Sequence, residues 1–142
     1  MRVIGIDPGM NTGIAIYEDG YLDELQTIEP TELDLLFTAY AHEPLFICFE
    51  DSRLQSHVWL PSQTKGVAAN IARKIGMVDA WCYYIERLCE KNNVAYFRVS
   101  PKAKGTKVDS ELFAKLTGWT ERSNQHERDA AMAAYQFRRK AC

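Results

Sequence analysis

Four side chains that can bind divalent cations stand at three places where a regular element begins or ends. Asp7 closes the apolar run VIGID, and Glu50 closes the run PLFICFE. His126 and Asp129 are three residues apart in NQHERDAAMAAY, which puts both on one face of a helix. Carboxylates with one imidazole form a hard ligand set that favours Mg²⁺, and the histidine shifts the balance a little toward Mn²⁺. The residue types therefore predict a divalent-metal site.

Such a site requires the two apolar runs to be neighbouring strands whose ends meet at one edge of a sheet. Like charges at that edge repel each other unless a cation lies between them. The last helix carries four small residues that allow close packing on the sheet: Ala130, Ala131, Ala133 and Ala134. Each candidate ligand also has an ordinary interpretation, because Asp suits turns and a helical His–Asp pair is usually a surface hydrogen bond. The joint placement is what favours the metal site.

The hydrophobic period predicts the elements that position these residues. Strands are expected at residues 1–7, 12–19, 20–29, 44–51 and 94–101, with Asp19-Gly20 as a hairpin turn. Helices are expected at residues 30–43, 64–91, 107–118 and 125–140, with a loop at 52–63. A capping box of Thr106 with Asp109 is predicted to open the third helix, and Asn124 with Glu127 the fourth. This order predicts a single domain, 1–142, of the α/β class, with a mixed five-stranded sheet flanked by helices.

Composition narrows the class of protein. With 142 residues, 46% of them apolar and 25% charged, the chain reads as one globular domain. It has no run of 18 apolar residues and no signal peptide, so we expect no membrane association and a cytoplasmic location. The cysteines, Cys48, Cys82, Cys89 and Cys142, form no CxxC pair and are expected to be free thiols.

Charge is divided unevenly along the chain. Residues 1–97 carry 7 Lys/Arg and 14 Asp/Glu, whereas residues 98–142 carry 10 and 5. An acidic first part and a basic last part suit a metal site beside an anionic polymer, although solvated surface charge would look the same. The basic segment SPKAKGTK places Lys102, Lys104 and Lys107 after a strand, where they act as a phosphate clamp or as a solvated loop.

The loop after Glu50 offers further candidates for nucleic-acid binding. Arg53 and Lys65 flank it and are candidates for phosphate contacts. Trp59 within it either stacks on a base or wedges into an open junction, or else packs onto the domain. The helix that follows has more apolar residues than one face needs: Val67, Ile71, Ile75, Val78, Trp81, Cys82, Ile85 and Leu88 or Cys89. Either two of its faces are buried in one domain, or it forms a dimer seam.

The segments GIDPGMNTGIAI, FED and HERDAAMAAY resemble the three motifs of RuvC-type Holliday-junction resolvases, in order and spacing over nearly the whole chain. The chain is shorter than many cellular members, which suits a short phage-type member. The resemblance implies a ribonuclease H-like fold and a homodimer formed through helix 64–91. It also implies that the dimer resolves four-way junction DNA by two paired cuts. It implies Asp7, Glu50, His126 and Asp129 as catalytic metal ligands for two Mg²⁺ ions, for which Mn²⁺ can substitute, with His126 alternatively a base. Gly9 and Gly13 would let phosphate and backbone approach.

Other activities share parts of this pattern. A nuclease of the same fold acting on RNA or other branched DNA is one alternative, and a non-catalytic junction-binding protein is another. Sugar kinases and actin-like ATPases also open with a strand followed by Asp and glycines. They need a second domain and a longer chain, and no GxxxxGK[ST] pattern occurs here.

Overall fold

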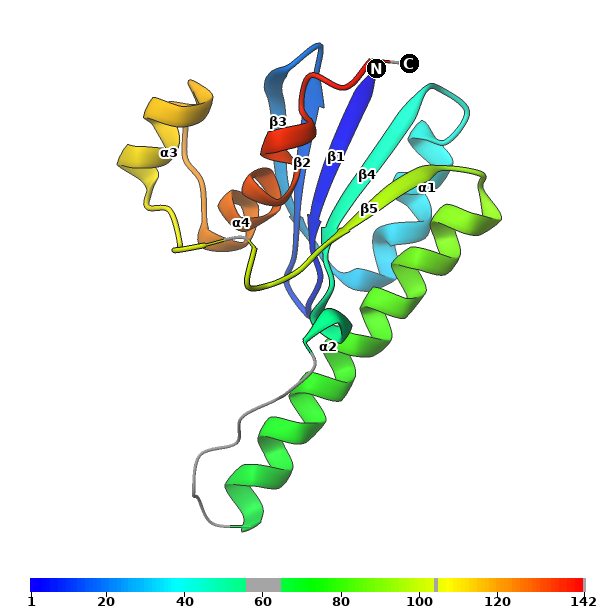
Figure 1. Cartoon of the computed structure of the whole chain (residues 1–142), viewed down its shortest axis with the longest axis vertical. Helices are drawn as coiled ribbons and strands as arrows, with labels where there is room; N and C mark the ends of the chain where they lie inside the picture. Colours follow the sequence, from blue (N-terminus) through cyan, green and yellow to red (C-terminus); the bar gives the residue numbers. More distant parts are fainter. Residues whose placement is uncertain (56–64, 104, 142) are drawn as a thin grey trace.

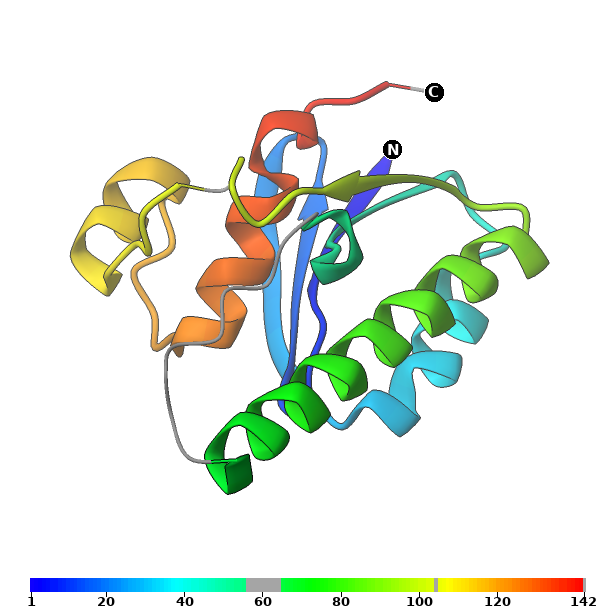
Figure 2. The same ribbon diagram turned by 60° about the horizontal axis from the view of Figure 1, so that its bottom comes forward.

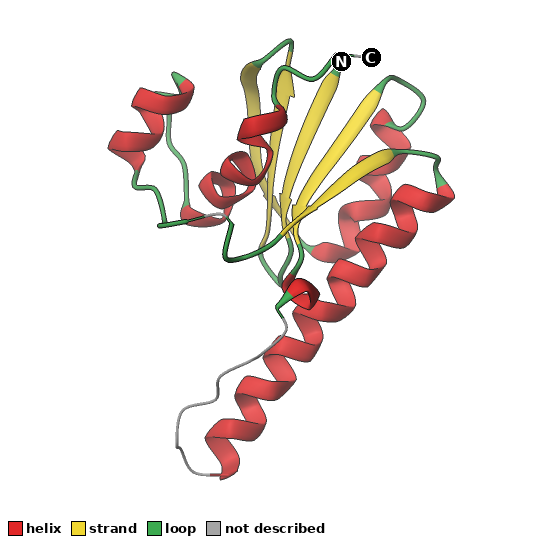
Figure 3. Ribbon diagram, in the orientation of Figure 1, coloured by secondary structure: helices red, strands yellow, loops and turns green. Residues whose placement is uncertain are grey.

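The computed structural model describes residues 1–55, 65–103 and 105–141. Its strands are β1 (Arg2–Asp7), β2 (Thr12–Glu18), β3 (Tyr21–Ile28), β4 (Leu45–Glu50) and β5 (Ala95–Val99). Its helices are α1 (Leu33–Tyr40), α2 (Lys65–Lys91), α3 (Ser110–Thr117) and α4 (Gln125–Ala134). The predicted α/β class, with a mixed five-stranded sheet flanked by helices, is confirmed (Figures 1 and 3).

The sheet combines a hairpin half with a parallel half. Its strand order is β3-β2-β1-β4-β5, in which β3, β2 and β1 pair antiparallel and β1, β4 and β5 pair parallel. The predicted turn between β2 and β3 is present, with Asp19 at φ 51° and Gly20 at φ 89°. Two successive left-handed residues match the twist of a tight hairpin. The parallel half brings the carboxyl ends of β1 and β4 to the same edge.

Each face of the sheet has its own apolar core. Helices α1 and α2 cover one face, and α4 covers the other with α3 beyond it (Figures 1 and 2). The strands alternate between these cores, as the two-residue period requires. Ile4 and Ile6 of β1 lie in the core beneath α1 and α2, whereas Val3 lies in the core beneath α4. A continuous apolar run such as β1 is therefore buried on both sides, as expected for a central strand.

Several predicted helix boundaries were wrong. The first helix, expected at 30–43, is a 3₁₀ turn at Pro30–Glu32 followed by α1. Asp109, and not Thr106, caps α3, because the Asp109 carboxylate accepts the N–H of Leu112 at 2.8 Å and the helix begins at Ser110. The capping box of Asn124 with Glu127 opens α4 as predicted. However, α4 ends at Ala134 and does not reach residue 140, since a 3₁₀ turn follows and the Arg138 N–H bonds three residues back.

Helix α2 is much longer than the sheet it covers. Its buried residues lie in its second half, at Cys82, Ile85, Leu88 and Cys89. Its first half extends past the edge of the sheet (Figures 1 and 3). One of the two expectations for this helix was that two of its faces are buried within one domain. That expectation does not hold for the first half of the helix.

Two expectations from composition can be compared with the structure. Cys48, Cys82 and Cys89 are buried free thiols, as expected, while Cys142 lies outside the described residues. Across residues 1–55, 65–103 and 105–141, no helix combines the length and the apolar character needed to cross a membrane.

Helix α4 approaches β1 closely enough to exclude a side chain. A Cβ atom on Gly5 would lie 2.0 Å from the carbonyl oxygen of Ala130 and 3.0 Å from the Cβ of Ala134. The carbonyl oxygen of Ala130 belongs to the backbone, so the helix itself would have to move. Glycine at this position and alanines on the facing helix together set the separation between α4 and the sheet.

We predict that Gly5→Ala lowers the free energy of unfolding by about 2 kcal/mol or more, because it overpacks this contact. Urea denaturation measures the change. The matched control is Gly76→Ala in α2, where a Cβ meets nothing within 4 Å. That substitution should raise stability by about 1 kcal/mol, because alanine favours helix. Equal stabilities of the two variants would contradict the packing argument.

Candidate active site

Strand pairing brings two of the predicted ligands together. Ile6 of β1 pairs with Phe49 of β4 in parallel register, so Asp7 and Glu50 are the next residues on adjacent strands. The side chains of Ile6 and Phe49 lie in the core beneath α1 and α2. Alternation then directs Asp7 and Glu50 to the opposite face, which α4 covers. The sequence prediction that these strands are neighbours is confirmed.

The first turn of α4 supplies the other two predicted ligands. The Nδ1 atom of His126 lies 3.5 Å from Oδ2 of Asp7. Gly13 of β2 permits this approach, because a Cβ there would lie 2.0 Å from the backbone oxygen of His126. The expectation that Gly13 lets backbone approach is met by the backbone of α4, and its expected role toward phosphate stays a prediction. Gly9, in contrast, lines the cavity beside Asp7, with only one atom within 4 Å of an added Cβ.

An open cavity of about 480 Å³ lies at this edge of the sheet. Asp7, Glu50, His126 and Asp129 all line it. Three further elements contribute to its wall: the turn after β1, Val78 of α2, and the loop after β5 with Pro101, Gly105 and Lys107. The fold therefore collects the four residues that the sequence singled out into one solvent-accessible space.

Asp129 is held by polar partners at the cavity wall. Its carboxylate accepts a hydrogen bond from Nε2 of Gln125 at 2.8 Å and lies 3.3 Å from Nζ of Lys107. The Lys107 side chain is 70% exposed, whereas that of Asp129 is 8% exposed. The ammonium group therefore reaches from the solvent-facing loop to a largely buried carboxylate, and it supplies positive charge at that carboxylate.

The donor chemistry of the cavity fits a divalent cation. Three carboxylates and one imidazole line it, which are ligands suited to Mg²⁺ and Mn²⁺. In the described part of the chain, no three His, Cys, Asp or Glu side chains are grouped closely enough to form a ready metal site. Two positive or titratable groups, Lys107 and His126, lie against Asp129 and Asp7. A bound cation would compete with them for the same carboxylates.

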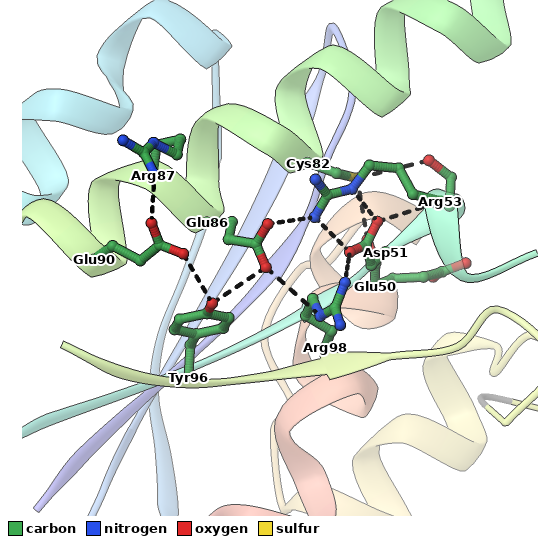
Figure 4. Close-up of polar contacts among 10 residues, drawn as sticks. Glu50, Asp51, Arg53, Cys82, Glu86, Arg87, Glu90, Tyr96 and Arg98 are labelled. Carbon is green, nitrogen blue, oxygen red and sulfur yellow. Dashed lines mark hydrogen bonds and ion pairs between the residues drawn. The ribbon is translucent and has the colours of Figure 1, made fainter.

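Arg53, a predicted DNA contact, is engaged within the protein. Its guanidinium donates to both carboxylate oxygens of Asp51, at 2.8 and 2.7 Å, and to Glu86 of α2 at 3.2 Å (Figure 4). Asp51 is fully buried. Burial alone would raise the pKa of Asp51, but hydrogen bonds from Arg53 hold that pKa below its usual range. The sequence analysis did not single out Asp51. An acidic residue that follows a buried strand, with an arginine two residues later, is a pattern that could have indicated this ion pair.

Of the other predicted nucleic-acid contacts, the structure places one at the cavity. Lys107 lines it, and Lys102 is exposed in the same loop. Lys65 is exposed at the start of α2. Trp59 and Lys104 lie outside the described residues, so their roles stay predictions.

Comparison with known proteins supports the fold. No protein-family model matches the chain, and no curated protein matches it significantly in sequence. Among solved structures, the chain is similar to T. thermophilus RuvC in complex with a Holliday junction substrate, with a TM-score of 0.61 and 14% identity. The match covers 95% of this chain and 90% of that chain. The predicted ribonuclease H-like architecture is therefore confirmed over nearly the whole length.

We predict that Lys107→Met tightens Mn²⁺ binding by the free protein about two- to fivefold. The substitution removes an ammonium that competes for Asp129, and an exposed ion pair contributes about 0.2–1 kcal/mol. Electron paramagnetic resonance of unbound Mn²⁺ measures the affinity. Lys115→Met is the control, because Lys115 pairs with Glu111 on α3 and is not among the residues that line the cavity. Weaker Mn²⁺ binding in Lys107→Met than in the control would contradict this arrangement.

Proposed function

We propose that the protein is a crossover junction endodeoxyribonuclease, which resolves four-way (Holliday) DNA junctions by paired, metal-dependent phosphodiester hydrolysis. The observation that carries the proposal is the shared cavity of Asp7, Glu50, His126 and Asp129 at the carboxyl edge of β1 and β4. The likeness in fold to RuvC solved with a Holliday junction supports it. Four potential ligands in one cavity also argue against a purely non-catalytic binding protein, which has no physical need for clustered like charge.

The four residues would hold two Mg²⁺ ions, with Mn²⁺ as a substitute. Bound ions supply a water of lowered pKa and stabilise the departing 3′ oxygen. The carboxylates of Asp7, Glu50 and Asp129, which come from two strands and a helix, would hold the ions in place. His126 lies 3.5 Å from Asp7 and completes the ligand set or accepts a proton from the attacking water.

The basic loop after β5 is suited to hold the scissile strand. Lys107 already lies at the cavity wall, and Lys102 is exposed a few residues earlier. Contacts from lysine to phosphate position a duplex without reading its sequence. Selection of a branched substrate then needs a further feature, and the arrangement of two active sites relative to each other would supply it.

The first half of α2 is suited to provide that arrangement. By helical period, the apolar stripe that packs on the sheet continues past the sheet edge; its members are Val67, Ile71, Ile75, Val78, Cys82, Ile85 and Cys89. Val67 is 46% exposed. A homodimer formed through this stripe has two-fold symmetry, which matches the symmetry of a four-way junction and its need for two cuts.

We predict that Asp7→Asn and Glu50→Gln each slow junction cleavage by more than about 100-fold, since losing even an outer-shell partner of a metal ligand costs about 10–100-fold. Junction binding should survive or improve, because less negative charge faces the DNA. Asp23→Asn on the exposed edge strand β3 is the control.

Cleavage is measured with Mg²⁺ or Mn²⁺ on a mobile four-way junction, duplex, flap and RNA–DNA hybrid. Near-normal cleavage by either variant would remove the metal-site assignment. Preferential cleavage of the hybrid or flap by the wild-type protein would instead point to one of the alternative nuclease activities.

We predict that Ile75→Glu produces monomers, because a carboxylate cannot be buried in an apolar seam without a partner. Sedimentation measures the oligomeric state, and a cruciform plasmid reports paired cuts as linear product and single cuts as nicked circles. Ala69→Glu, on the opposite side of α2 by helical period, should leave both unchanged. A wild-type protein that is monomeric at micromolar concentration yet makes paired cuts would rule out the dimer.

A further inference from the structure

An ionic cluster surrounds the buried carboxylate of Asp51, the residue that follows Glu50. We call it the Asp51 cluster, and it consists of Asp51, Arg53, Glu86 and Arg98 (Figure 4). Besides the contacts of Arg53 described above, Arg98 Nη1 lies 3.5 Å from Asp51, and Arg98 Nε lies 3.6 Å from Glu86. Two carboxylates face two guanidinium groups, so the cluster is neutral only when all four members are present. Breaking such a pair leaves an uncompensated charge away from water.

The cluster is joined to Glu50 through the backbone. Glu50 and Asp51 are consecutive and extended, so their side chains point to opposite faces of the sheet. Glu50 lines the cavity, whereas Asp51 is directed toward α2 and the two arginines. In Figure 4 the Glu50 side chain runs away from the arginines that hold Asp51. A shift of the Asp51 backbone would therefore carry the Cα of Glu50 with it.

The peptide group that joins Glu50 to Asp51 is held at both its N–H and its carbonyl. The N–H of Asp51 donates to the carbonyl of Val99 at 2.8 Å, and the thiol of Cys82 lies 3.6 Å from the carbonyl of Glu50. The hydroxyl of Ser52 donates to Asp79 at 2.6 Å. Asp79, Cys82 and Glu86 recur at three- and four-residue intervals, so one face of α2 makes all three contacts. This face holds the end of β4.

The geometry points to the Asp51 cluster as the positioning device for Glu50, with Glu86 of α2 as a required member. Asp51 and Glu86 act through Glu50 and do not touch the cavity themselves. The inference rests on the proposed function, because it assigns Glu50 to a metal site. It adds that α2, the helix of the proposed dimer seam, also sets the position of a metal ligand.

The competing explanation is that the arginines serve the DNA directly. Arg98 is 41% exposed and Arg53 is 24% exposed, so a phosphate could reach part of each guanidinium. A phosphate contact and a positioning role differ in what they predict. The first affects affinity for junction DNA, and the second affects metal affinity in the absence of DNA.

Glu86→Gln tests the inference against a matched control, Glu90→Gln. Both residues lie on α2, one turn apart, and both accept a hydrogen bond from the Tyr96 hydroxyl, at 3.1 and 3.4 Å. Of the two, Glu86 contacts Arg53 and Arg98, whereas Glu90 pairs with Arg87. The two variants therefore remove equal charge from the same helix, but they differ in whether the cluster is broken.

Glu86→Gln should weaken Mn²⁺ binding and lower kcat by about 10-fold or more, the usual effect of removing an outer-shell partner, with junction affinity in Ca²⁺ kept within roughly twofold. Glu90→Gln should change none of these. Glu86→Asp, which keeps the charge, should recover part of the Mn²⁺ affinity. Urea denaturation of each variant shows the folded fraction, so that loss of metal affinity is compared among folded proteins.

Three results would overturn the inference. In the first, Glu86→Gln and Glu90→Gln bind Mn²⁺ equally well, whereas Glu50→Gln binds Mn²⁺ more weakly. This result would leave the proposed metal site intact. The second is weaker junction binding in Ca²⁺ with unchanged Mn²⁺ affinity, which would assign the arginines to DNA. The third is unchanged Mn²⁺ affinity in Glu50→Gln itself, which would overturn the proposed metal site as well.

Discussion

Parallel pairing of β1 with β4 is the constraint on which the rest of the candidate site depends. The register that places Ile6 beside Phe49 also makes Asp7 and Glu50 neighbours, on the face that α4 covers. Two ionised carboxylates in such a position repel each other unless positive charge is nearby. In this structure His126 lies against Asp7 and Lys107 lies against Asp129, and both positive or titratable groups line the same cavity as the carboxylates.

Close approach of α4 to the sheet completes the site. Gly5 and Gly13 face backbone oxygens of Ala130 and His126 at distances that no side chain would permit. The helix therefore lies low enough for its first turn to reach the end of β1. Packing and chemistry are coupled here, because the same contact that closes the core beneath α4 also brings an imidazole to the carboxylate of Asp7.

Helix α2 combines structural roles that are usually separate. Its second half closes the other core through Cys82, Ile85 and Cys89. On the same part of the helix, Asp79 and Glu86 hold the segment that follows β4. Its first half carries the same apolar stripe beyond the sheet. In the proposed homodimer, one part of α2 would form the seam while another part holds the end of β4.

Local patterns in the sequence were enough to predict the strands, the hairpin at Asp19-Gly20, the cap at Asn124 and the candidate ligands. These features depend on residue type and on periods of 2 and 3.6 residues, which neighbours in the chain largely decide. Asp7, Glu50, His126 and Asp129 could be grouped because strand ends and helix starts gather at one sheet edge. The cap at Asp109 and the end of α4 were missed, because competing caps and a change to 3₁₀ hydrogen bonding are settled by the surroundings.

Only the tertiary structure decided the partners of side chains that are far apart in the sequence. Arg53 reads as a free cation beside a loop, yet it is committed to Asp51 and to Glu86, which lies 33 residues later. Gly13 was expected to let phosphate and backbone approach, and the structure identifies that backbone as the first turn of α4, more than a hundred residues away. The physical reason is the same in both cases. The effect of a buried charge or of a missing Cβ depends on the groups that pack against it. The arrangement of strands and helices, and not the local sequence pattern, decides which groups those are.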